Sequence, residues 1–539
     1  MNAASPSARP RLGSRVASQR PAGSNGGPAL VLPPSGGPSS RKFLSVDPSE
    51  AQRDSAHAFK AAGVIGSSLL VTQAIGFLGN NIVVTRLLKE HYGPVRFADS
   101  FAMLSMMALN LGVDTYVRKE VAVRPDHAGE FASGVLGARI ILGVGFMLVS
   151  FSILIGTHRP PLVILLALLF CVGQLLQHLS ETSAAYLQAV GSVREASIMR
   201  VGSKLAWAVV AIGGVVAGLG VWIVPAAMVV SEGSKAIVLG LLSRRRLQFR
   251  FRLDVGARKA TWAVLVASLP FLMTHINTVL SATLDVSMVG FLTNNDEVGF
   301  YGSATNIALV ALVLAPVISW VLLPLLSRSL ARSEDEFWRV VCRSLEIVLT
   351  IAVPLSVLLS LNADVVIKMT IGSFFSPAVP ALRVLAPMFV LTYVTILCAS
   401  GLIRLGRGWF IARVGIAAVA FNVILNLILI RRGLSWWGPG GAGTGASISI
   451  VIAEAFVASS YVYALGRKAF DRRSLRTIGI TLVASVFIVA LDRTMLPLCR
   501  SVPVVRPMVD TGLFLAHLLG LGVIRPSELR RLVKGGGFS

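Results

Sequence analysis

The sequence of 539 residues has little charge, since Asp, Glu, Lys and Arg together make up only 14% of it. Soluble domains carry about 25% charged residues, most of them on the surface that faces water. In their place the chain has 54% hydrophobic residues and a mean hydropathy of +0.73. This composition argues against an ordinary soluble protein and favours a membrane protein.

Cysteine is scarce as well, with Cys171, Cys342, Cys398 and Cys499 as the only four. No two of them form a C-x-x-C pair, and Cys171 and Cys398 lie inside apolar segments. The sequence therefore predicts neither a disulfide framework nor a metal site. It also lacks the G-x-x-x-x-G-K-[ST] motif of phosphate-binding loops, which argues against an ATP-driven pump.

Acidic residues are outnumbered: the chain has 26 Asp and Glu against 50 Lys and Arg, and its formal net charge is +24. In a soluble protein this charge would suggest a nucleic-acid partner. Here the basic residues form short clusters between apolar segments, without aromatic residues interleaved for base stacking. We therefore expect no nucleic-acid partner, and we assign the basic clusters to loops at a membrane surface.

Apolar segments of bilayer-spanning length recur from about residue 61 onward. A bilayer core about 30 Å thick takes roughly 20 helical residues to cross. The sequence predicts an all-α polytopic membrane protein with about 14 transmembrane helices. The predicted spans are 61–88, 96–121, 130–157, 160–188, 195–218, 221–243, 260–292, 297–327, 337–361, 376–403, 409–430, 442–465, 475–491 and 504–523.

Basic clusters follow the even-numbered spans, and this alternation sets the predicted topology. The densest cluster, RRRLQFRFRLDVGARK (244–259), follows the sixth span, whereas the loops after the fifth and seventh spans contain no Lys or Arg. Two pairs depart from the alternation, namely Arg431 with Arg432 and Arg493 with Arg500. Because cytoplasmic loops carry an excess of Lys and Arg, we expect both termini in the cytoplasm.

Two pairs of segments suggest an internal repeat. LQAVGSVREASIMRVG (187–202) and IRLGRGWFIARVG (403–415) each enter a helix through a Gly-basic turn followed by R-V-G. EHYGPVRFADS (90–100) opens the second span much as DEVGFYGSATN (296–306) opens the eighth, although short apolar segments also resemble each other by chance. Spans 1–6 and 7–12 are therefore predicted to form two six-helix lobes around a central cavity, an arrangement that suits alternating access.

The predicted domain organisation follows from these spans. A tail rich in Pro, Ser, Gly and Arg precedes the first span and contains no apolar segment of signal-peptide length, so we predict that it is disordered and cytoplasmic. Two further helices follow the second lobe. The predicted boundaries are 1–58 for the tail, 59–250 for the N-lobe, 251–468 for the C-lobe, 469–525 for the two C-terminal helices and 526–539 for a cytoplasmic C-terminal tail.

Several charged and polar residues lie inside the predicted spans at helical spacing. A charged group at the bilayer centre costs about 2.5–3.5 kcal/mol on insertion scales, so such groups face protein or water. At this spacing the residues share one face of a helix and form polar stripes. These stripes either line a hydrated path or form hydrogen bonds between helices. They are Asn110, Asp114 and Arg118 in the second span, Gln174, Gln177, Glu181 and Gln188 in the fourth, His275, Thr278 and Asp285 in the seventh, and Asn422 and Asn426 in the eleventh.

Charged residues that lie singly in the spans have other alternative roles. Arg118 and Lys204 lie near predicted cytoplasmic ends, where they act either as snorkelling anchors or as cavity residues. Glu232 and Lys235 have the spacing of an internal ion pair. Asp285 is about seven residues from the end of its span, or roughly 10 Å inside it by helical rise. It is interpreted as a cation-coupling site or a partner for a cavity arginine, with a structural salt bridge as the alternative.

Six short segments carry a family resemblance. The segments are TRLLKEHYG (85–93), LGVDTYVRKEVA (111–122), LPFL (269–272), TLDVSMVGFL (283–292), EVGFYGSA (297–304) and GPGGAGTGAS (438–447). In their order and spacing they resemble O-antigen flippases, which belong to the polysaccharide-transporter branch of the multidrug/oligosaccharidyl-lipid/polysaccharide exporter superfamily. The resemblance covers about residues 60–525. The sequence departs from it in its long N-terminal tail and at Lys89-Glu90-His91, where the family has Gly-Pro-Glu.

The resemblance implies a flippase that moves an undecaprenyl-pyrophosphate-linked oligosaccharide from the inner to the outer leaflet of a bacterial inner membrane. The process implied is O-antigen (lipopolysaccharide) or exopolysaccharide biosynthesis, and the mechanism implied is alternating access. Relatives hold the anionic substrate in a cationic cavity and often couple its transport to an ion, which here would be H⁺ or Na⁺. The resemblance implies no cofactor and no enzyme chemistry.

Seven residues are the candidates for these roles. Motif matches supply Arg86, Asp114, Arg118 and Asp285, and helical positions supply Glu181, Lys204 and Glu454. Glu454 has no obvious partner nearby in the sequence. The candidates for the substrate cavity are Arg86, Asp114, Arg118, Glu181 and Lys204, and those for ion coupling are Asp285 and Glu454.

Other transporters and one class of enzyme are the alternatives. A cation-coupled multidrug antiporter of the same superfamily shares a twelve-helix core, and a lipid II flippase also has fourteen spans. A membrane glycosyltransferase, ligase or polymerase needs a long extracytoplasmic loop, whereas the longest one predicted here is about 362–375. The expected partners are the lipid-linked oligosaccharide, membrane lipid and polysaccharide assembly proteins, and the chain is expected to be a monomer.

Overall fold

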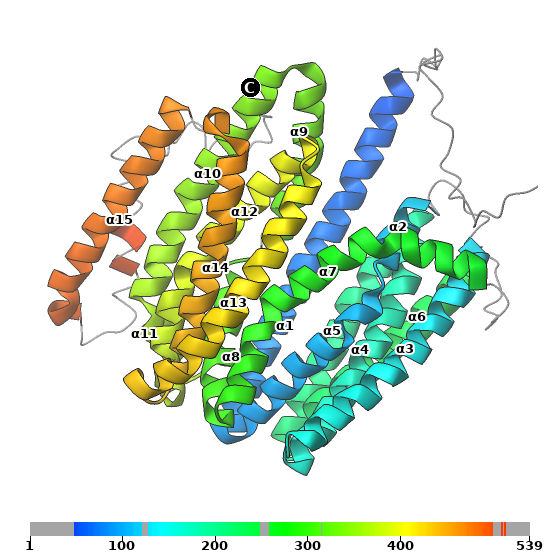
Figure 1. Cartoon of the computed structure of the whole chain (residues 1–539), viewed down its shortest axis with the longest axis horizontal. Coiled ribbons are helices and arrows are strands. Elements are labelled where there is room, and N and C mark those ends of the chain that lie inside the picture. Colours follow the sequence, from blue (N-terminus) through cyan, green and yellow to red (C-terminus); the bar gives the residue numbers. More distant parts are fainter. Residues whose placement is uncertain are drawn as a thin grey trace, which may run out of the picture. The chain divides into compact units, whose positions relative to one another are not determined.

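The structure, a computed structural model, describes residues 48–120, 128–247, 258–313, 315–469, 471–499, 508–509 and 511–513. Throughout these ranges the regular structure is helical, which confirms the predicted all-α fold (Figure 1). The chain divides into two compact units, Met1–Ala56 and His57–Ser539, and the apolar helices belong to the second. Most of the predicted tail, 1–58, lies outside the described residues.

The helices follow one another with short connections. Their bounds are α1 (Pro48–Met106), η1 (Met107–Asn110), α2 (Val113–Glu120), α3 (Ala128–Gly156), α4 (Pro161–Ala189), α5 (Val193–Val216), α6 (Ile223–Leu247), α7 (Arg258–Leu292), α8 (Asn295–Val310), α9 (Ala315–Arg332), α10 (Glu334–Leu361), α11 (Ala363–Thr370), η4 (Ser373–Ala378), α12 (Val379–Arg404), α13 (Gly408–Trp437), α14 (Gly441–Leu465), η5 (Arg467–Ala469) and α15 (Arg472–Cys499).

Within the described residues, 10 helical stretches are long and apolar enough to cross a membrane, so the chain is a multi-pass membrane protein. Each of them coincides with one of the predicted spans. Of the other predicted spans, 260–292 is a single helix, α7, and 504–523 lies almost wholly outside the described residues. The remaining two, 96–121 and 297–327, are interrupted. The total of fourteen spans stays a prediction.

The placement of tryptophan supports a membrane-crossing orientation for α13. Trp409 lies at its start, Trp436 and Trp437 lie at its end, and all three are exposed. The separation along the helix is roughly 40 Å by helical rise. Tryptophan gathers at both membrane interfaces, which lie about 40–45 Å apart when the headgroup regions are included.

The long helix α1 contains two of the predicted spans, or parts of them, and reverses direction between them. The Asn80 side chain donates a hydrogen bond to the Tyr92 hydroxyl at 3.5 Å. These residues would lie roughly 18 Å apart along a straight helix, beyond the reach of their side chains. The chain therefore turns back between them, close to Pro94, which removes an intrahelical hydrogen bond.

The second predicted span is interrupted beside a candidate residue. Helix α1 passes into η1, and then Leu111 and Gly112 adopt the left-handed conformation, with φ of 55° and 68°, before α2 begins. The Asn110 side chain accepts a hydrogen bond from the Gly112 amide at 3.1 Å, a local bond that competes with the helix. A Cβ on Gly112 would lie 2.2 Å from the Ser268 carbonyl oxygen on α7. The close approach to α7 therefore requires glycine at position 112.

The eighth predicted span is interrupted at the equivalent place. Helix α8 ends at Val310, a turn occupies 311–313, and α9 begins at Ala315. The two interruptions follow the two similar segments, 90–100 and 296–306, at comparable distances along the chain. Non-helical backbone at membrane depth occurs where it is buried in protein or lines a cavity, so this pair marks the region to search for a functional site.

Helix α7 packs against elements on both sides of it in the sequence (green in Figure 1). It contacts η1, α2 and α3, which precede it, and α8, α13 and α14, which follow it. Other extensive contacts stay within one predicted lobe, such as α4 with α6 or α12 with α14, whereas α15 packs on α10. The division into an N-lobe and a C-lobe at residue 250 stays a prediction, with α7 as the helix that contacts both.

Candidate functional site

A fully buried ion pair lies at the interruption of the second span. The Arg139 guanidinium on α3 lies 3.1 Å from the carboxylate of Asp114, which is in the first turn of α2. Both side chains are buried, that of Arg139 completely. The stripe of Asn110, Asp114 and Arg118 therefore does not act as a unit, because Asp114 pairs with Arg139 while Arg118 is exposed.

Arg139 also holds the backbone around the interruption. It donates to the Asn110 carbonyl oxygen at 2.6 Å, to the His178 carbonyl oxygen at 2.5 Å and to the Thr182 hydroxyl. Thr182 in turn donates to Asp114 at 3.2 Å. Arg139 was not among the predicted site residues. The signal in the sequence is a single arginine within the otherwise apolar span 130–157.

A second charged cluster joins α4, α5 and α6. The predicted pair of Glu232 and Lys235 is present at 2.7 Å, and Lys235 also lies 3.4 Å from Glu181. Arg200 contacts the other Glu181 oxygen at 3.5 Å. Ser180 donates to Glu232 at 3.2 Å. The structure thus places the candidate Glu181 between two cations.

The three basic candidates, Arg118, Lys204 and Arg86, differ in how they relate to this cluster. The charge of Arg118 acts on Glu181, and Arg118 itself is exposed. The Lys204 ammonium lies 4.1 Å from the centre of the Trp207 ring, and the acidic groups whose charges act on it are Asp99 and Glu232. Arg86 is exposed on α1, separate from the cluster.

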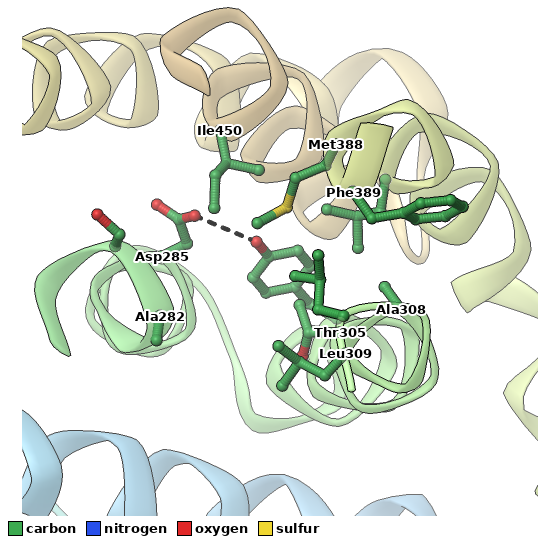
Figure 2. A pocket seen from close by; sticks show the side chains of 12 residues that line it. Ala282, Asp285, Thr305, Ala308, Leu309, Met388, Phe389 and Ile450 are labelled. Atoms are coloured by element: carbon green, nitrogen blue, oxygen red, sulfur yellow. Dashed lines mark hydrogen bonds between the residues drawn. The ribbon is translucent and has the colours of Figure 1, made fainter. Parts of the chain in front are cut away.

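The buried carboxylate of Asp285 on α7 accepts hydrogen bonds from neutral groups. Asn426 on α13 donates to it at 2.6 Å. The Tyr301 hydroxyl on α8 donates at 3.4 Å, the bond drawn as a dashed line in Figure 2. Asn426 also donates to Asn422 at 3.0 Å. The predicted pair Asn422 and Asn426 therefore meets Asp285 directly. No ion pair joins Asp285 to another residue of the described ranges, so the cavity arginine and the structural salt bridge are not found there.

A cavity of about 40 Å³ opens beside Asp285, which is room for about three water molecules. Figure 2 shows Asp285 facing Met388 on α12 and Ile450 on α14 across it. Carboxylate and amide oxygens are hard ligands, so this group suits a proton or a small cation such as Na⁺. The lining residues are Ser281, Ala282, Asp285, Tyr301, Thr305, Ala308, Leu309, Leu312, Leu385, Met388, Phe389 and Ile450.

Glu454, the other ion-coupling candidate, lies on α14 beside two threonines of α12, Thr392 and Thr395. No ion pair joins Glu454 to another residue in the described part of the chain. The structure therefore places the two ion-coupling candidates in different surroundings. Asp285 accepts hydrogen bonds from firmly placed donors, whereas Glu454 faces only hydroxyl groups.

One carboxylate of the EVGFYGSA segment has a structural role. Glu297, which is buried, accepts hydrogen bonds from the backbone amides of Gly440 at 2.6 Å and Ala442 at 3.1 Å. These amides are at the start of α14, where helical N–H groups have no intrahelical partner and the helix dipole favours a negative charge. Glu297 therefore ties the start of α8 to the start of α14.

The first half of α7 contacts η1 and α2 of the predicted N-lobe, and a second set of contacts between the two predicted lobes lies toward the α7–α8 turn, called here the α7–α8 end. Ser100 donates to the Thr283 carbonyl oxygen at 2.7 Å, and Asn306 donates to Asn81 at 3.1 Å. Arg159, in the α3–α4 turn, donates to the Gly290 carbonyl oxygen at 2.6 Å. Its guanidinium also lies 4.6 Å from the ring centre of Phe97 and 5.1 Å from that of Phe291, as in cation–π contacts.

Two solved structures have a similar arrangement. A lipid II flippase, MurJ, in an inward closed conformation matches with a TM-score of 0.60 and 13% identity, over 83% of this chain and 99% of its own. A multidrug resistance MATE family transporter in an inward-facing conformation matches with a TM-score of 0.61 and 15% identity, over 74% and 94%. At these identities the similarity establishes the fold alone.

The family follows from the sequence match. The model of the family described as polysaccharide biosynthesis protein matches residues 58–330, just over half of the chain, and the chain belongs to that family. A Haloferax volcanii protein, described as the probable low-salt glycan biosynthesis flippase Agl15, is 23% identical over 170 residues. That alignment covers 31% of this chain and 35% of the relative. The resemblance to the polysaccharide branch of the superfamily is thereby confirmed.

Proposed function

We propose that the chain is a flippase for undecaprenyl-pyrophosphate-linked oligosaccharides in O-antigen or exopolysaccharide biosynthesis. The observation that carries the proposal is the surplus of positive charge in the cluster of α2, α4, α5 and α6. Four cations there accompany two carboxylates, Glu181 and Glu232. A pyrophosphate entering a low-dielectric site needs such cations to offset its charge. The four are Arg118, Arg200, Lys204 and Lys235.

The proposal extends to the location and the mechanism. Both termini lie in the cytoplasm, the membrane is a bacterial inner membrane, and the protein acts as a monomer beside the proteins of polysaccharide assembly. The contacts at the α7–α8 end support an alternating-access mechanism in which this end is closed and must open. The proposal includes no enzyme chemistry, in line with similar proteins that are described as flippases and transporters.

Two members of the same superfamily are the rival functions, a multidrug antiporter and a lipid II flippase. The fold does not discriminate, because the TM-scores for the two kinds of transporter are 0.60 and 0.61. The match to the polysaccharide family favours the oligosaccharide substrate.

Leaflet exchange of a lipid-linked glycan tests the proposal. The protein is reconstituted in liposomes with a labelled polyprenyl-pyrophosphate oligosaccharide, and the accessibility of the label is followed with H⁺ and Na⁺ gradients imposed. We expect protein-dependent exchange that Asp285→Asn slows about tenfold, a coupling of ordinary size between an ion site and a substrate site. Glu334→Gln is the control, because Glu334 is exposed and pairs with Lys468 at the surface.

The possible outcomes distinguish the role of Asp285 from the flippase function itself. Exchange that Asp285→Asn leaves unchanged would retain the flippase and assign Asp285 to structure. Absence of exchange with several glycans under every gradient would contradict the proposal and favour the multidrug antiporter.

A substitution of Arg159 tests whether the α7–α8 end is closed and must open. Arg159→Ala removes a charge-assisted hydrogen bond, worth about 1.5–3 kcal/mol, and two cation–π contacts that only the closed state makes. We expect the ratio of open to closed molecules to rise about tenfold. Spin labels at Thr157 and Ser376, in a cysteine-free background, report the change as a shift of their distance distribution toward longer values.

The matched control for this experiment is Arg383→Ala. Arg383 pairs with Asp364 within the predicted C-lobe, and its described hydrogen bonds and ion pair do not involve the predicted N-lobe. Equal distance distributions in wild type and Arg159→Ala would refute the role of Arg159 at the closed end.

A further inference from the structure

The surroundings of Glu454 leave its negative charge without compensation. Its carboxylate lies in the membrane-spanning part of α14 and faces the hydroxyl groups of Thr392 and Thr395 on α12. Both hydroxyl oxygens are buried and have no hydrogen-bond partner of ordinary geometry in the described ranges. Other threonines of the chain, such as Thr283, donate to the carbonyl four residues earlier. Thr392 and Thr395 thus retain their hydrogen-bonding capacity for Glu454.

No charged group on the elements packed against α14 supplies the compensation. Helix α14 packs against α7, α8, α12, α13, η4 and η5. The Lys and Arg residues of α12, α13 and η5 are all exposed, namely Arg383, Arg404, Arg413, Arg431, Arg432, Arg467 and Lys468. Among the described residues, Tyr461 on α14 itself is the titratable group on which the charge of Glu454 acts. A carboxylate at membrane depth without a cation is costly, and such groups neutralise by taking up a proton.

Glu454 and Thr392 lie next to the cavity beside Asp285, one helical turn further along α14 and α12. Met388 and Ile450 line that cavity, and Thr392 and Glu454 follow them by four residues on α12 and α14. Residues four apart lie on one face of a helix, about 6 Å further along its axis. Glu454 is therefore about one helical turn beyond the cavity wall, displaced from Asp285 toward the end of α14.

We propose that Glu454, with Thr392 and Thr395, forms a proton-binding site that is separate from Asp285 and connected to it through the cavity. A proton suits this group better than a metal ion because its four side-chain oxygens do not complete the shell of a hard cation, whereas a carboxylic acid needs only hydroxyl partners. The site itself does not depend on the proposed substrate. Its use in coupling rests on the proposed flippase function.

Infrared difference spectroscopy of the purified full-length protein, titrated with pH, tests the site without any transport assay. We expect a carboxylic-acid C=O band that disappears at high pH and that is absent in Glu454→Gln. Because glutamine imitates the protonated acid in shape and charge, this variant should keep the melting temperature of the wild type. The double variant Thr392→Val/Thr395→Val should keep the band and shift its frequency, which covers the case in which Glu454→Gln does not fold.

The control is Glu346→Gln, because Glu346 on α10 is also buried but pairs with Arg343 at 2.9 Å and accepts a hydrogen bond from Thr477. This variant should leave the band unchanged. A band that persists in Glu454→Gln, or that disappears on adding Na⁺ at constant pH, would overturn the proton site. In liposomes, Glu454→Gln should abolish the response of leaflet exchange to a pH gradient, whereas the control Glu346→Gln should keep that response. A Glu454→Gln variant that still responds to the pH gradient would overturn the role of Glu454 in coupling.

Discussion

Arg139→Met is expected to lower the free energy of unfolding by about 3–5 kcal/mol, because it leaves Asp114 as a buried charge without a partner. The substitution also leaves the carbonyl oxygens of Asn110 and His178 without the donor that Arg139 supplies. The measurement is the unfolding of the purified protein in detergent, followed by circular dichroism as denaturant is added.

The double variant Arg139→Met/Asp114→Asn distinguishes this cause from lost packing. Once the carboxylate is neutral, removal of the guanidinium no longer leaves an unpaired charge, and we expect most of the stability to return. A double variant as unstable as Arg139→Met would show that packing, and not the unpaired charge, accounts for the loss.

Glu297→Ala is expected to cost roughly 2–4 kcal/mol, because it leaves the buried amides of Gly440 and Ala442 without an acceptor. It also removes a negative charge from the start of α14, where the helix dipole favours one. Thermal unfolding in detergent measures the change.

Two further variants test whether the acceptor is the cause. Glu297→Gln keeps one acceptor oxygen and should lose about half as much stability. Glu334→Gln, at an exposed surface pair, should change the stability by less than about 1 kcal/mol. If Glu297→Ala were as stable as the wild type, the connection between α8 and α14 would have no energetic role.

Two kinds of feature could be predicted from the sequence. They are the contacts between residues of one helix and the positions of the long apolar helices. The pair of Glu232 and Lys235 follows from their spacing on α6, and the stacking of Asn422 and Asn426 follows from theirs on α13. The bilayer forces long apolar segments to be helices, because backbone groups in lipid must be hydrogen-bonded internally. Periodicity alone was therefore sufficient for these features.

Contacts between helices that are distant in the sequence could not be predicted. The sequence of the second span does not indicate that Asp114 pairs with Arg139, since Arg118 is the cation at helical spacing from Asp114. Only the packing of α2 on α3 and α4 brings Asp114 and Arg139 together. The interruption at Leu111 and Gly112 was missed for a similar reason. The left-handed backbone there depends on the close approach of Gly112 to Ser268, a partner far along the chain.

The position of α7 has a consequence for how the protein is made. The ion pair of Asp114 and Arg139 lies in helices that are inserted into the membrane early, yet Gly112 and His178 beside it are covered by α7. The first six spans therefore leave the translocon with a polar site still exposed to lipid, and they complete their packing only when α7 is synthesised. A ribosome stalled before residue 258 would hold an N-terminal half that has been inserted but has not yet folded.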